Sequence, residues 1–576
     1  MAEKQPNAGR IELQSDPVIT VEVCRESDLQ EGEMMEVEVG EHKVLLLRSG
    51  GVFSAIGNSC THYGAPLSKG AFSGGRVRCP WHGACFNITT GDIEEYPGLD
   101  CLPYHKVTVE KNKVYVSAKM KSLKQPKRMK EMGRRVPEIT HTVLLVGGGP
   151  AALVCAETLR QENYGGRIVM ITKDNLLPYD RTKLSKAMNI EDDSILLRRM
   201  EFFHQYDIEV WVNKEVTSVN TEKKTVTLND STLHHYDQLL IATGSRSVPR
   251  GLECPGSDLE NVIFLRVPED AKKIHHGSTN RQVAVIGSSF IGMEVASYLA
   301  DKAASVTVIG SSKFPYERTL GPEVGIVAMQ ILEEKNVKFY MKDRVTEIKG
   351  QNRKVKEIIL RSGAVVPADI VIAGIGVIPN SEFLKGSSVN LDSKNMVIVD
   401  KFMKTNILNV FSAGDVTSFP LAVSKNQRVS LGHWHLAQTQ GRVAALNMLN
   451  KPTEMNSVPF YWTVLAGKSI RYADKYFFDL PGKIKCHHRN NLWFDHHFIV
   501  SLIYLGYGEG YTEVILKGKV EELKFLAFYI KNDEVVAAAS LNFDPAVSQF
   551  AERMAAGKRI TRDQAESEEL GWLKLP

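Results

Sequence analysis

Two stretches of the chain repeat one local pattern, in which an apolar strand is followed by a glycine-rich turn, an amphipathic helix and a second apolar strand. The first stretch is TVLLVGGGPAALVCAETLRQENYGGRIVMIT, from Thr142, and the second is QVAVIGSSFIGMEVASYLADKAASVTVIG, from Gln282. A unit of this kind sets its strands parallel and points the N-terminus of its helix at a bound phosphate. Two such units predict two nucleotide-binding domains of the Rossmann type.

The chain has 576 residues, which is too long for one hydrophobic core, so we expect a multi-domain protein. Short alternating runs split by glycine-rich turns precede the first unit and predict a small all-β domain. A mixed α+β segment ends the chain. The expected parts are an N-terminal tail (1–17), the all-β domain (18–118), a linker (119–140), a first nucleotide-binding domain (141–265 and 381–450), a second (266–380) and the α+β domain (451–576).

Composition narrows the partners and the location. The net charge of +4 is small for this length, so we expect no nucleic-acid partner. The eight scattered cysteines favour a reducing compartment, and the first residues contain no apolar signal sequence. The longest apolar run, FIVSLIYLGY from Phe498, is far shorter than the ~20 residues that span a bilayer. The sequence therefore predicts a cytoplasmic protein without a transmembrane segment.

The expected linker, KMKSLKQPKRMKEMGRRVPEIT, is basic and contains no strand pattern. Its charge run is typical of a solvated tether, and nucleic-acid binding is the alternative. A flexible tether of ~20 residues spans roughly 25 Å, which would let the all-β domain reach across its neighbour.

Two short pairs of metal-ligating residues lie inside the all-β domain. Cys60-x-His62 and Cys79-x-x-His82 each project a thiolate and an imidazole from one loop. Two interpretations fit such a set: a [2Fe–2S] cluster with cysteines on one iron and histidines on the other, or a closed Cys2His2 zinc site. The segments CTHYGAPL and CPWHGACF resemble the motifs of Rieske ferredoxins. The resemblance implies the cluster, with Cys60, His62, Cys79 and His82 as its ligands.

Departures from the Rieske pattern bear on the cluster potential. High-potential Rieske proteins carry an extra cysteine in each loop and a hydroxyl that bonds the cluster sulfur, whereas this chain has Ala65, Trp81 and Ala84. Fewer donors to sulfur stabilise the reduced cluster less, so we expect a potential near the low end of the Rieske range. We expect Cys85 and Cys101 to pack as small apolar residues.

Three separated motifs indicate a flavin. G-x-G-x-x-A in the first unit allows a close approach to a pyrophosphate. Together with YDQLLIATGS and TNILNVFSAGDVT it resembles the FAD motifs of glutathione-reductase-like flavoproteins. No C-x-x-x-x-C follows the first motif, so the redox disulfide of the disulfide reductases is missing. The residues that the resemblance assigns to FAD in these motifs are Gly147, Gly149, Ala152, Thr243, Gly244 and Asp415.

The segment DNLLPYDRTKLSK resembles part of the ferredoxin and rubredoxin reductases and of apoptosis-inducing factor. This resemblance implies that Asp174 binds the adenosine ribose and that Arg181 and Lys186 lie by the isoalloxazine. It also implies that Glu294 pairs with Lys186 beneath the flavin, and that this pair tunes the flavin. Two tryptophans fall where the family places aromatic residues near the ring, and core packing is the alternative for both. They are Trp434 and Trp462.

The second unit departs further from its pattern. Gly287 and Gly292 are present for a nicotinamide nucleotide, but Ser289 replaces the middle glycine and crowds the pyrophosphate. Gly310 stands where NADH-preferring relatives carry a glutamate, and Lys313 could pair with a 2′-phosphate. Three alternatives follow: a site that tolerates NADPH, weak use of NADH, or a degenerate site.

Taken as a whole, the chain resembles the Rieske-bearing members of the apoptosis-inducing factor family. The resemblance implies an all-β Rieske domain followed by a glutathione-reductase-like α/β reductase, and a pro-apoptotic, mitochondria-associated role. We expect an FAD-dependent oxidoreductase that passes electrons from NAD(P)H through FAD to the tethered cluster. The alternative is a redox-sensing binding protein. The expected partners are a nicotinamide nucleotide, an electron acceptor and apoptotic proteins; the sequence does not give the oligomeric state, and a dimer is one alternative.

One block interrupts the family pattern. The relatives continue RYA directly into GYGEG, whereas here 474–505 lies between the two. An extra exon or a retained intron is one explanation, and a metal site is the other. The residues that suggest a metal are Cys486, His487, His488, His496 and His497. We expect a poorly ordered excursion between two strands.

Overall fold

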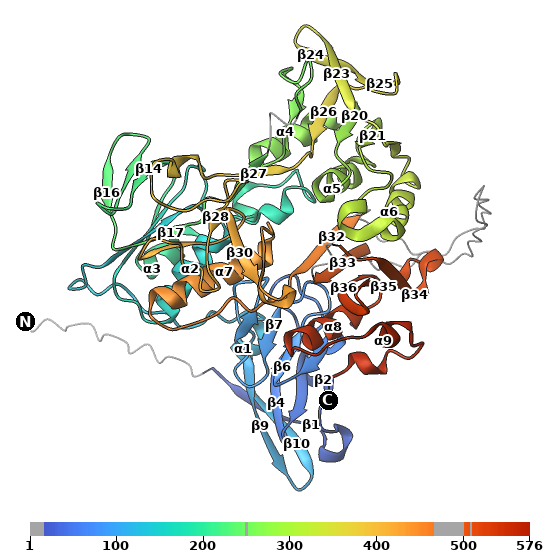
Figure 1. Cartoon of the computed structure of the whole chain (residues 1–576). Coiled ribbons are helices and arrows are strands. Elements are labelled where there is room, and N and C mark those ends of the chain that lie inside the picture. The colour runs from blue at the N-terminus through green and yellow to red at the C-terminus, as the bar shows by residue number, and fades with distance from the viewer. Residues whose placement is uncertain (1–15, 248–251, 466–499, 507–509, 576) are drawn as a thin grey trace, which may run out of the picture.

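A computed structural model of the chain describes residues 16–247, 252–465, 500–506 and 510–575. Figure 1 shows the N-terminal domain, in blue, against both the first nucleotide-binding domain and the C-terminal helices, in red. The second nucleotide-binding domain lies at the opposite end of the molecule. In these ranges no helix is both apolar enough and long enough to cross a membrane.

The N-terminal domain consists of two antiparallel sheets. In β10 the side chains of Val114, Val116 and Ala118 point inward, as the alternation in the sequence predicts. The larger sheet has the order β1-β10-β9-β4-β3-β2 and the smaller β5-β6-β7-β8. The bounds are β1 (Val18–Arg25), β2 (Met34–Val39), β3 (His42–Ser49), β4 (Val52–Gly57), β5 (Ala71–Ser73), β6 (Arg76–Arg78), β7 (Cys85–Asn87), β8 (Ile93–Glu95), β9 (Tyr104–Glu110) and β10 (Lys113–Lys119).

The basic segment after β10 is mostly exposed, as expected of a linker, but it contacts the domains on both sides at particular residues. It begins with α1 (Met120–Lys124). The backbone of Arg128 then pairs with Cys101 of the N-terminal domain, and the Arg128 guanidinium bonds Asp92. Further on, Met132 is buried in the core of the first nucleotide-binding domain. Arg128 therefore contacts the N-terminal domain, and Met132 contacts the first nucleotide-binding domain. A fully solvated tether would make neither contact.

The first nucleotide-binding domain has a parallel sheet of order β13-β12-β11-β17-β29. The last strand comes from the far side of the second unit, which is why two chain segments build this domain. Its core is made by the apolar strands and by α2 against α7. The bounds are β11 (Thr142–Val146), α2 (Pro150–Gln161), β12 (Arg167–Ile171), α3 (Met200–Gln205), β13 (Ile208–Trp211), β14 (Val216–Asn220), β15 (Thr225–Leu228), β16 (Leu233–His235), β17 (Gln238–Ile241), β28 (Val397–Ile398), β29 (Val410–Ser412), β30 (Thr417–Leu421), β31 (Gln427–Val429) and α7 (Trp434–Met448).

The second nucleotide-binding domain has a parallel sheet of order β19-β26-β20-β21-β22. Strand β19 already belongs to it, so this domain begins before the expected boundary at 266. The antiparallel pair β18 (Ser245–Ser247) and β27 (Val377–Pro379) connects the two domains. The bounds are β19 (Val262–Ile263), α4 (Pro268–Ser278), β20 (Gln282–Ile286), α5 (Phe290–Leu299), β21 (Ser305–Gly310), α6 (Glu317–Glu333), β22 (Lys338–Met341), β23 (Val345–Gln351), β24 (Lys354–Leu360), β25 (Val365–Pro367) and β26 (Ile370–Ala373).

The C-terminal domain has an antiparallel sheet of order β32-β33-β36-β35-β34. Strand β33 pairs with β32 and β36, so the end of the predicted insertion, 500–505, is a regular part of this sheet. The rest of that prediction, with its cysteine and histidines, lies outside the described residues. The bounds are β32 (Phe460–Leu465), β33 (Val500–Gly506), β34 (Glu513–Lys519), β35 (Lys524–Lys531), β36 (Glu534–Leu541), α8 (Ala546–Ala555) and α9 (Arg562–Glu566).

Candidate redox site

The two loops that carry the predicted cluster ligands have the same backbone fold. The amide of Cys60 donates to the carbonyl five residues on (2.9 Å), and the amide of Cys79 does the same (2.8 Å). Each cysteine carbonyl also accepts from a glycine four residues on, Gly64 at 2.9 Å and Gly83 at 3.3 Å. Both glycines have φ of +78°, which an L side chain rarely adopts. The paired motifs therefore build two matching turns.

The four predicted ligands meet as a sulfur pair and a nitrogen pair. The thiols of Cys60 and Cys79 hydrogen-bond to each other, and the Nδ1 atoms of His62 and His82 are 3.2 Å apart. Within the described ranges, no three His, Cys, Asp or Glu side chains lie where they could share one metal ion. A closed zinc site needs all four ligands around one centre, whereas a [2Fe–2S] cluster takes two sulfurs and two nitrogens on separate irons. The arrangement fits the cluster.

Burial acts in opposite ways on the two kinds of ligand: it favours the neutral imidazoles that bind metals, and it opposes the thiolates. It lowers the pKa of His62 to about 4 and that of His82 well below its usual value, so both imidazoles are neutral. The hydrogen bond from Cys79 lowers the pKa of the Cys60 thiol, while burial raises that of Cys79. Neutral imidazoles and thiolates are the forms that ligate metals.

An aromatic side chain of the C-terminal domain lies against the histidine pair. The Trp462 ring is centred 4.8 Å from His82 and 5.8 Å from His62. On its other side, His433 makes an edge contact at 4.8 Å. The sequence allowed two interpretations of Trp462, an aromatic residue near the flavin or a core residue. The structure places its ring against the two histidines of the predicted cluster. Trp434 begins α7 and packs on the C-terminal core.

Tyr63 joins the first cluster loop to the expected flavin segment, and the sequence analysis did not single it out. Its ring stacks on His62 with centroids 3.9 Å apart. Its hydroxyl donates to Asp180 (2.9 Å) and lies 3.4 Å from the Thr182 hydroxyl. The same segment ends at Lys186. An aromatic residue directly after a ligating histidine is the only signal that pointed to this contact.

The first glycine-rich turn leaves room for a pyrophosphate. Gly147 has φ of +134°, and a Cβ there would come within 2.1 Å of the Ala242 carbonyl. Gly149 caps α2, and a Cβ at this position would meet nothing within 4 Å. Ala152 is fully buried beneath the turn. Open space in front of a helix N-terminus is the geometry that binds a dinucleotide phosphate.

Asp174 and Arg181 form an ion pair of 2.5 Å. The Tyr179 hydroxyl also donates to Asp174, and Arg181 donates to the Arg266 carbonyl. The structure therefore places Arg181 beside the residue expected at the adenosine ribose, and its expected place by the isoalloxazine stays a prediction. The carboxylate of Asp174 draws the guanidinium to this position.

Lys186 and Glu294 pair as the family resemblance implied. The Lys186 ammonium donates to the Glu294 carboxylate at 2.8 Å, and Glu294 is only 4% exposed. Glu294 accepts two further hydrogen bonds, from Ser185 and from Thr463 (2.7 Å). The sequence analysis missed these two hydroxyls. Glu294 of the second nucleotide-binding domain is thus held by three donors from the two other domains, which fixes the carboxylate and the lysine together.

The two later flavin motifs contact the connection between domains. The Thr243 hydroxyl donates to the Asn380 carbonyl (2.6 Å), and the Asn380 amide donates to the Gly244 carbonyl (2.9 Å). Asp415 accepts from the Ser245 hydroxyl at 3.1 Å. Residues of all three predicted flavin motifs therefore border one region, as a dinucleotide site requires.

In the second unit both predicted glycines allow close packing of helix and strand. A Cβ at Gly287 would lie 2.3 Å from the Gly374 carbonyl, and one at Gly292 would lie 1.9 Å from the Gly287 carbonyl. Ser289 caps α5 with an exposed side chain. The serine therefore crowds the turn from the solvent side without disturbing the fold.

The end of β21 carries an acidic side chain that the sequence analysis missed. The Glu317 carboxylate accepts from the amides of Lys313 (2.6 Å) and Phe314 (3.2 Å), just after Gly310. The Lys313 ammonium lies over the Phe314 ring at 5.0 Å. A carboxylate near this strand end is the feature that binds a ribose diol in Rossmann domains.

Three family profiles match the chain. Residues 141–441 match pyridine nucleotide-disulphide oxidoreductase, 19–108 match the Rieske [2Fe-2S] domain and 492–571 match the reductase C-terminal domain. These matches confirm the predicted fold class and the predicted cofactors, which are FAD, a [2Fe–2S] cluster and NAD(P)H.

Individual proteins agree with the profiles. Human apoptosis-inducing factor 3 is 46% identical over 549 residues, which is 94% of this chain and 85% of that protein. Rubredoxin-NAD(+) reductase of Pseudomonas putida is 31% identical over 57% of this chain and 85% of its own. The crystal structure of the ferredoxin reductase for the CYP199A2 system of Rhodopseudomonas palustris has a TM-score of 0.66 and 25% identity, covering 76% of this chain and all of that one.

Proposed function

This chain belongs to the family of apoptosis-inducing factor 3 and is an FAD-dependent NAD(P)H oxidoreductase, and from that premise we propose that it reduces its own Rieske cluster. FAD accepts a hydride and releases electrons one at a time, and a [2Fe–2S] cluster accepts one. The two centres would thus convert a two-electron donor into a one-electron carrier within one molecule.

The observation that carries the proposal is the contact between the histidine pair and the reductase. Trp462 lies 4.8 Å from His82, and Tyr63 joins His62 to the segment of Lys186. The cluster would therefore receive electrons from the flavin at the point where its loops touch the flavin-binding face. A docked carrier needs no encounter with a second molecule.

The chain's own residues position the reactants. The turn of Gly147 and Gly149 would hold the FAD pyrophosphate, and Asp174 would bind the ribose. Lys186 would lie at the isoalloxazine, with its position fixed by Glu294 at 2.8 Å. A lysine ammonium in this place favours the anionic, reduced form of the ring.

We also propose that NADH is the better donor. Glu317 holds a negative charge at the end of β21, and Lys313 is occupied over a phenylalanine ring. A carboxylate there accepts hydrogen bonds from a ribose diol and repels a 2′-phosphate. This differs from the expectation that the loss of an acid at Gly310 admits NADPH.

A second candidate is a redox-sensing protein in cell death. The name of the human relative supports a pro-apoptotic role. An association with mitochondria rests on the family resemblance of the sequence alone. In that function the redox state of the flavin would control binding to a partner. Slow turnover with a long-lived reduced flavin favours it, and rapid turnover with an artificial acceptor favours the electron-transfer function.

Anaerobic rapid mixing with NADH, and separately with NADPH, tests the proposal. We expect the flavin absorption to bleach first and the Rieske absorption to follow, with NADH faster. Flavin reduction without cluster reduction would contradict internal transfer. If neither nucleotide reduces the flavin while dithionite reduces both centres, the redox-sensing function takes its place.

A further inference from the structure

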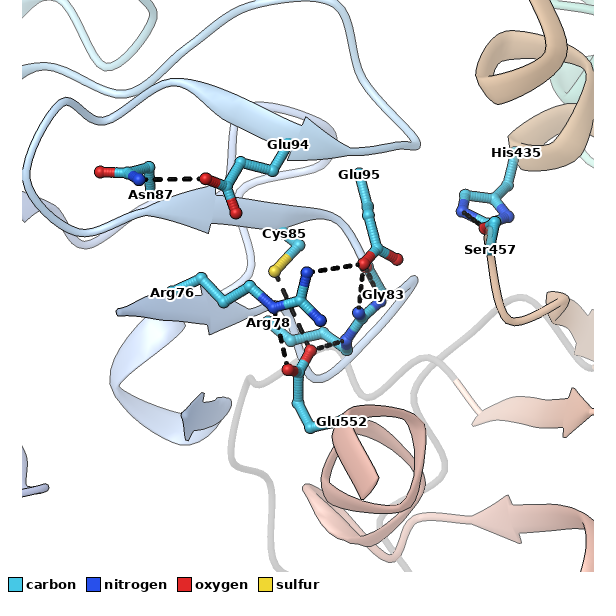
Figure 2. Close-up of polar contacts among 10 residues, drawn as sticks. All are labelled: Arg76, Arg78, Gly83, Cys85, Asn87, Glu94, Glu95, His435, Ser457 and Glu552. Carbon is cyan, nitrogen blue, oxygen red and sulfur yellow. Dashed lines mark hydrogen bonds and ion pairs between the residues drawn. The ribbon is translucent and has the colours of Figure 1, made fainter. Parts of the chain in front are cut away.

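Four charged side chains, two of them buried and two partly exposed, lie behind the second cluster loop, at the junction of two domains. Arg76 and Arg78 on β6 and Glu95 on β8 belong to the N-terminal domain, whereas Glu552 belongs to α8 of the C-terminal domain (Figure 2). The Arg78 side chain is 0% exposed and the Glu552 side chain 5%. We call these four residues the junction network.

The network is a closed ring of ion pairs. Arg78 bonds Glu552 at 2.5 Å and Glu95 at 2.9 Å. Arg76 bonds the same two carboxylates, each at 3.0 Å. Figure 2 shows Glu552 reaching up from its helix to both arginines. Two positive and two negative charges balance, but only when the C-terminal domain is in place.

The network is attached directly to the loop that carries Cys79 and His82. Arg78 precedes Cys79 and donates to the Gly83 carbonyl at 3.0 Å. One turn before Glu552 on α8, the Ser548 hydroxyl donates to the Cys79 carbonyl at 2.9 Å. A change of charge in the junction network therefore takes place directly beside the loop that holds the cluster, and should change the electrostatic potential at the cluster.

The surrounding groups leave the balance unchanged. Burial opposes ionisation of Glu95, but Arg78 and Arg76 outweigh it and lower the pKa of that carboxyl. On the far side of Glu95 lies His435, beside Ser457 (Figure 2). Burial lowers the pKa of His435 to about 4, so this imidazole adds no charge near neutral pH.

We propose that Glu552 is a positioning residue which, by docking against Arg76 and Arg78, both holds the second cluster loop and sets the reduction potential of the cluster. The inference rests on the proposed function only in requiring that the cluster is bound. A reduced cluster carries one more negative charge than an oxidised one. Two arginines without their partner from α8 would stabilise that charge, so docking lowers the potential.

Paired substitutions of opposite sign test the proposal. In full-length protein, EPR-monitored redox titration with dithionite and mediators measures the cluster potential without any nicotinamide. We expect Glu552→Gln to raise the potential, because it leaves one uncompensated positive charge. Arg76→Gln should lower the potential, and Glu552→Asp should restore the wild-type value.

The matched control is Glu566→Gln, which removes an exposed carboxylate paired with Arg562 on α9 of the same domain. It should leave the potential unchanged. If Glu552→Gln does not fold, Arg76→Gln decides alone, since that side chain is 24% exposed.

Shifts of the same sign in both variants, or no shift in either, would overturn the proposal. Opposite shifts in a protein whose cluster NAD(P)H does not reduce would uphold this inference and overturn the proposed function. If NAD(P)H reduces the cluster but the two variants do not shift its potential in opposite directions, the proposed function is upheld and this inference is overturned.

Discussion

The two cluster loops have the same backbone and opposite surroundings. The first loop reaches the reductase through two rings: Tyr63, which is 42% exposed and donates to Asp180, and His62, which lies 5.8 Å from Trp462. The second loop is enclosed: a Cβ at Gly83 would lie 2.7 Å from the Phe460 ring, and Ser548 and Arg78 hold the backbone on either side of it. The chain thus anchors its cluster through one loop and leaves the other in a lighter contact with the flavin-binding segment.

Replacing the matching glycines should separate the loops most strongly. In Gly83→Ala and Gly64→Ala the new alanine must adopt the positive φ of the glycine that it replaces, which destabilises each loop by about 1–2 kcal/mol. Only Gly83 also drives a methyl group into a buried aromatic ring, since Gly64 has no neighbour closer than 3.7 Å. We expect Gly83→Ala to lose cluster and lower the melting temperature well beyond Gly64→Ala. Equal losses of cluster in the two variants would contradict the claim that the second loop is the more tightly enclosed one.

Acid should lower the stability of the cluster-free protein through a histidine of each loop. The pKa of His62 is lowered to about 4 from 6.5, and that of His82 is also lowered, both by burial. The unfolded chain therefore binds more protons, so the free energy of unfolding falls as the pH drops from about 6.5 towards 4. Urea titrations across this range should show it. His82→Asn and His62→Asn should each flatten the profile; an unchanged profile in either variant would contradict the account.

The hydroxyl of Ser548 should have an intermediate effect. Ser548→Ala leaves the buried carbonyl of Cys79 without this donor, which destabilises the docked state by about 1–2 kcal/mol. Hydrogen exchange at α8 and in the second loop should rise together. The exposed Ser567 of the same domain offers a control, Ser567→Ala, which should leave exchange in both regions unchanged.

The smallest effect is expected at the first loop. Tyr63→Phe keeps the aromatic ring stacked on His62 and removes only the hydrogen bond to Asp180. The lost hydrogen bond contributes about 0.5–1 kcal/mol to stability. Cluster content and flavin reduction should be unchanged, while transfer from flavin to cluster slows modestly. Loss of the cluster in this variant would show that the first loop is an anchor as well.

The ligand loops and the flavin motifs could be proposed from the sequence because each depends on residues that are close along the chain, and their assignment to the cofactors stays a prediction. Cys60-x-His62 and Cys79-x-x-His82 form matching turns, and the Lys186–Glu294 pair was implied by two family motifs. The profiles and relatives confirm the fold class, the enzyme class and the cofactors.

Docking was not predictable in the same way. Arg78 and Glu552 are 474 positions apart, and neither residue belongs to a local pattern. The contacts of the linker were not predictable for a related reason: a basic run is typical of a tether, and nothing local shows that Arg128 and Met132 find partners in two different domains. Glu317 escaped notice because it lies seven residues beyond the strand end and folds back.

The central claim is that electrons pass from the flavin to a cluster that is docked in the same molecule. The most direct test is the rate of cluster reduction after rapid anaerobic mixing with NADH, measured over a wide range of protein concentrations. The account predicts that the cluster is reduced after the flavin, at a rate that does not change with concentration. A rate that rises in proportion to concentration would show transfer between molecules and would contradict it.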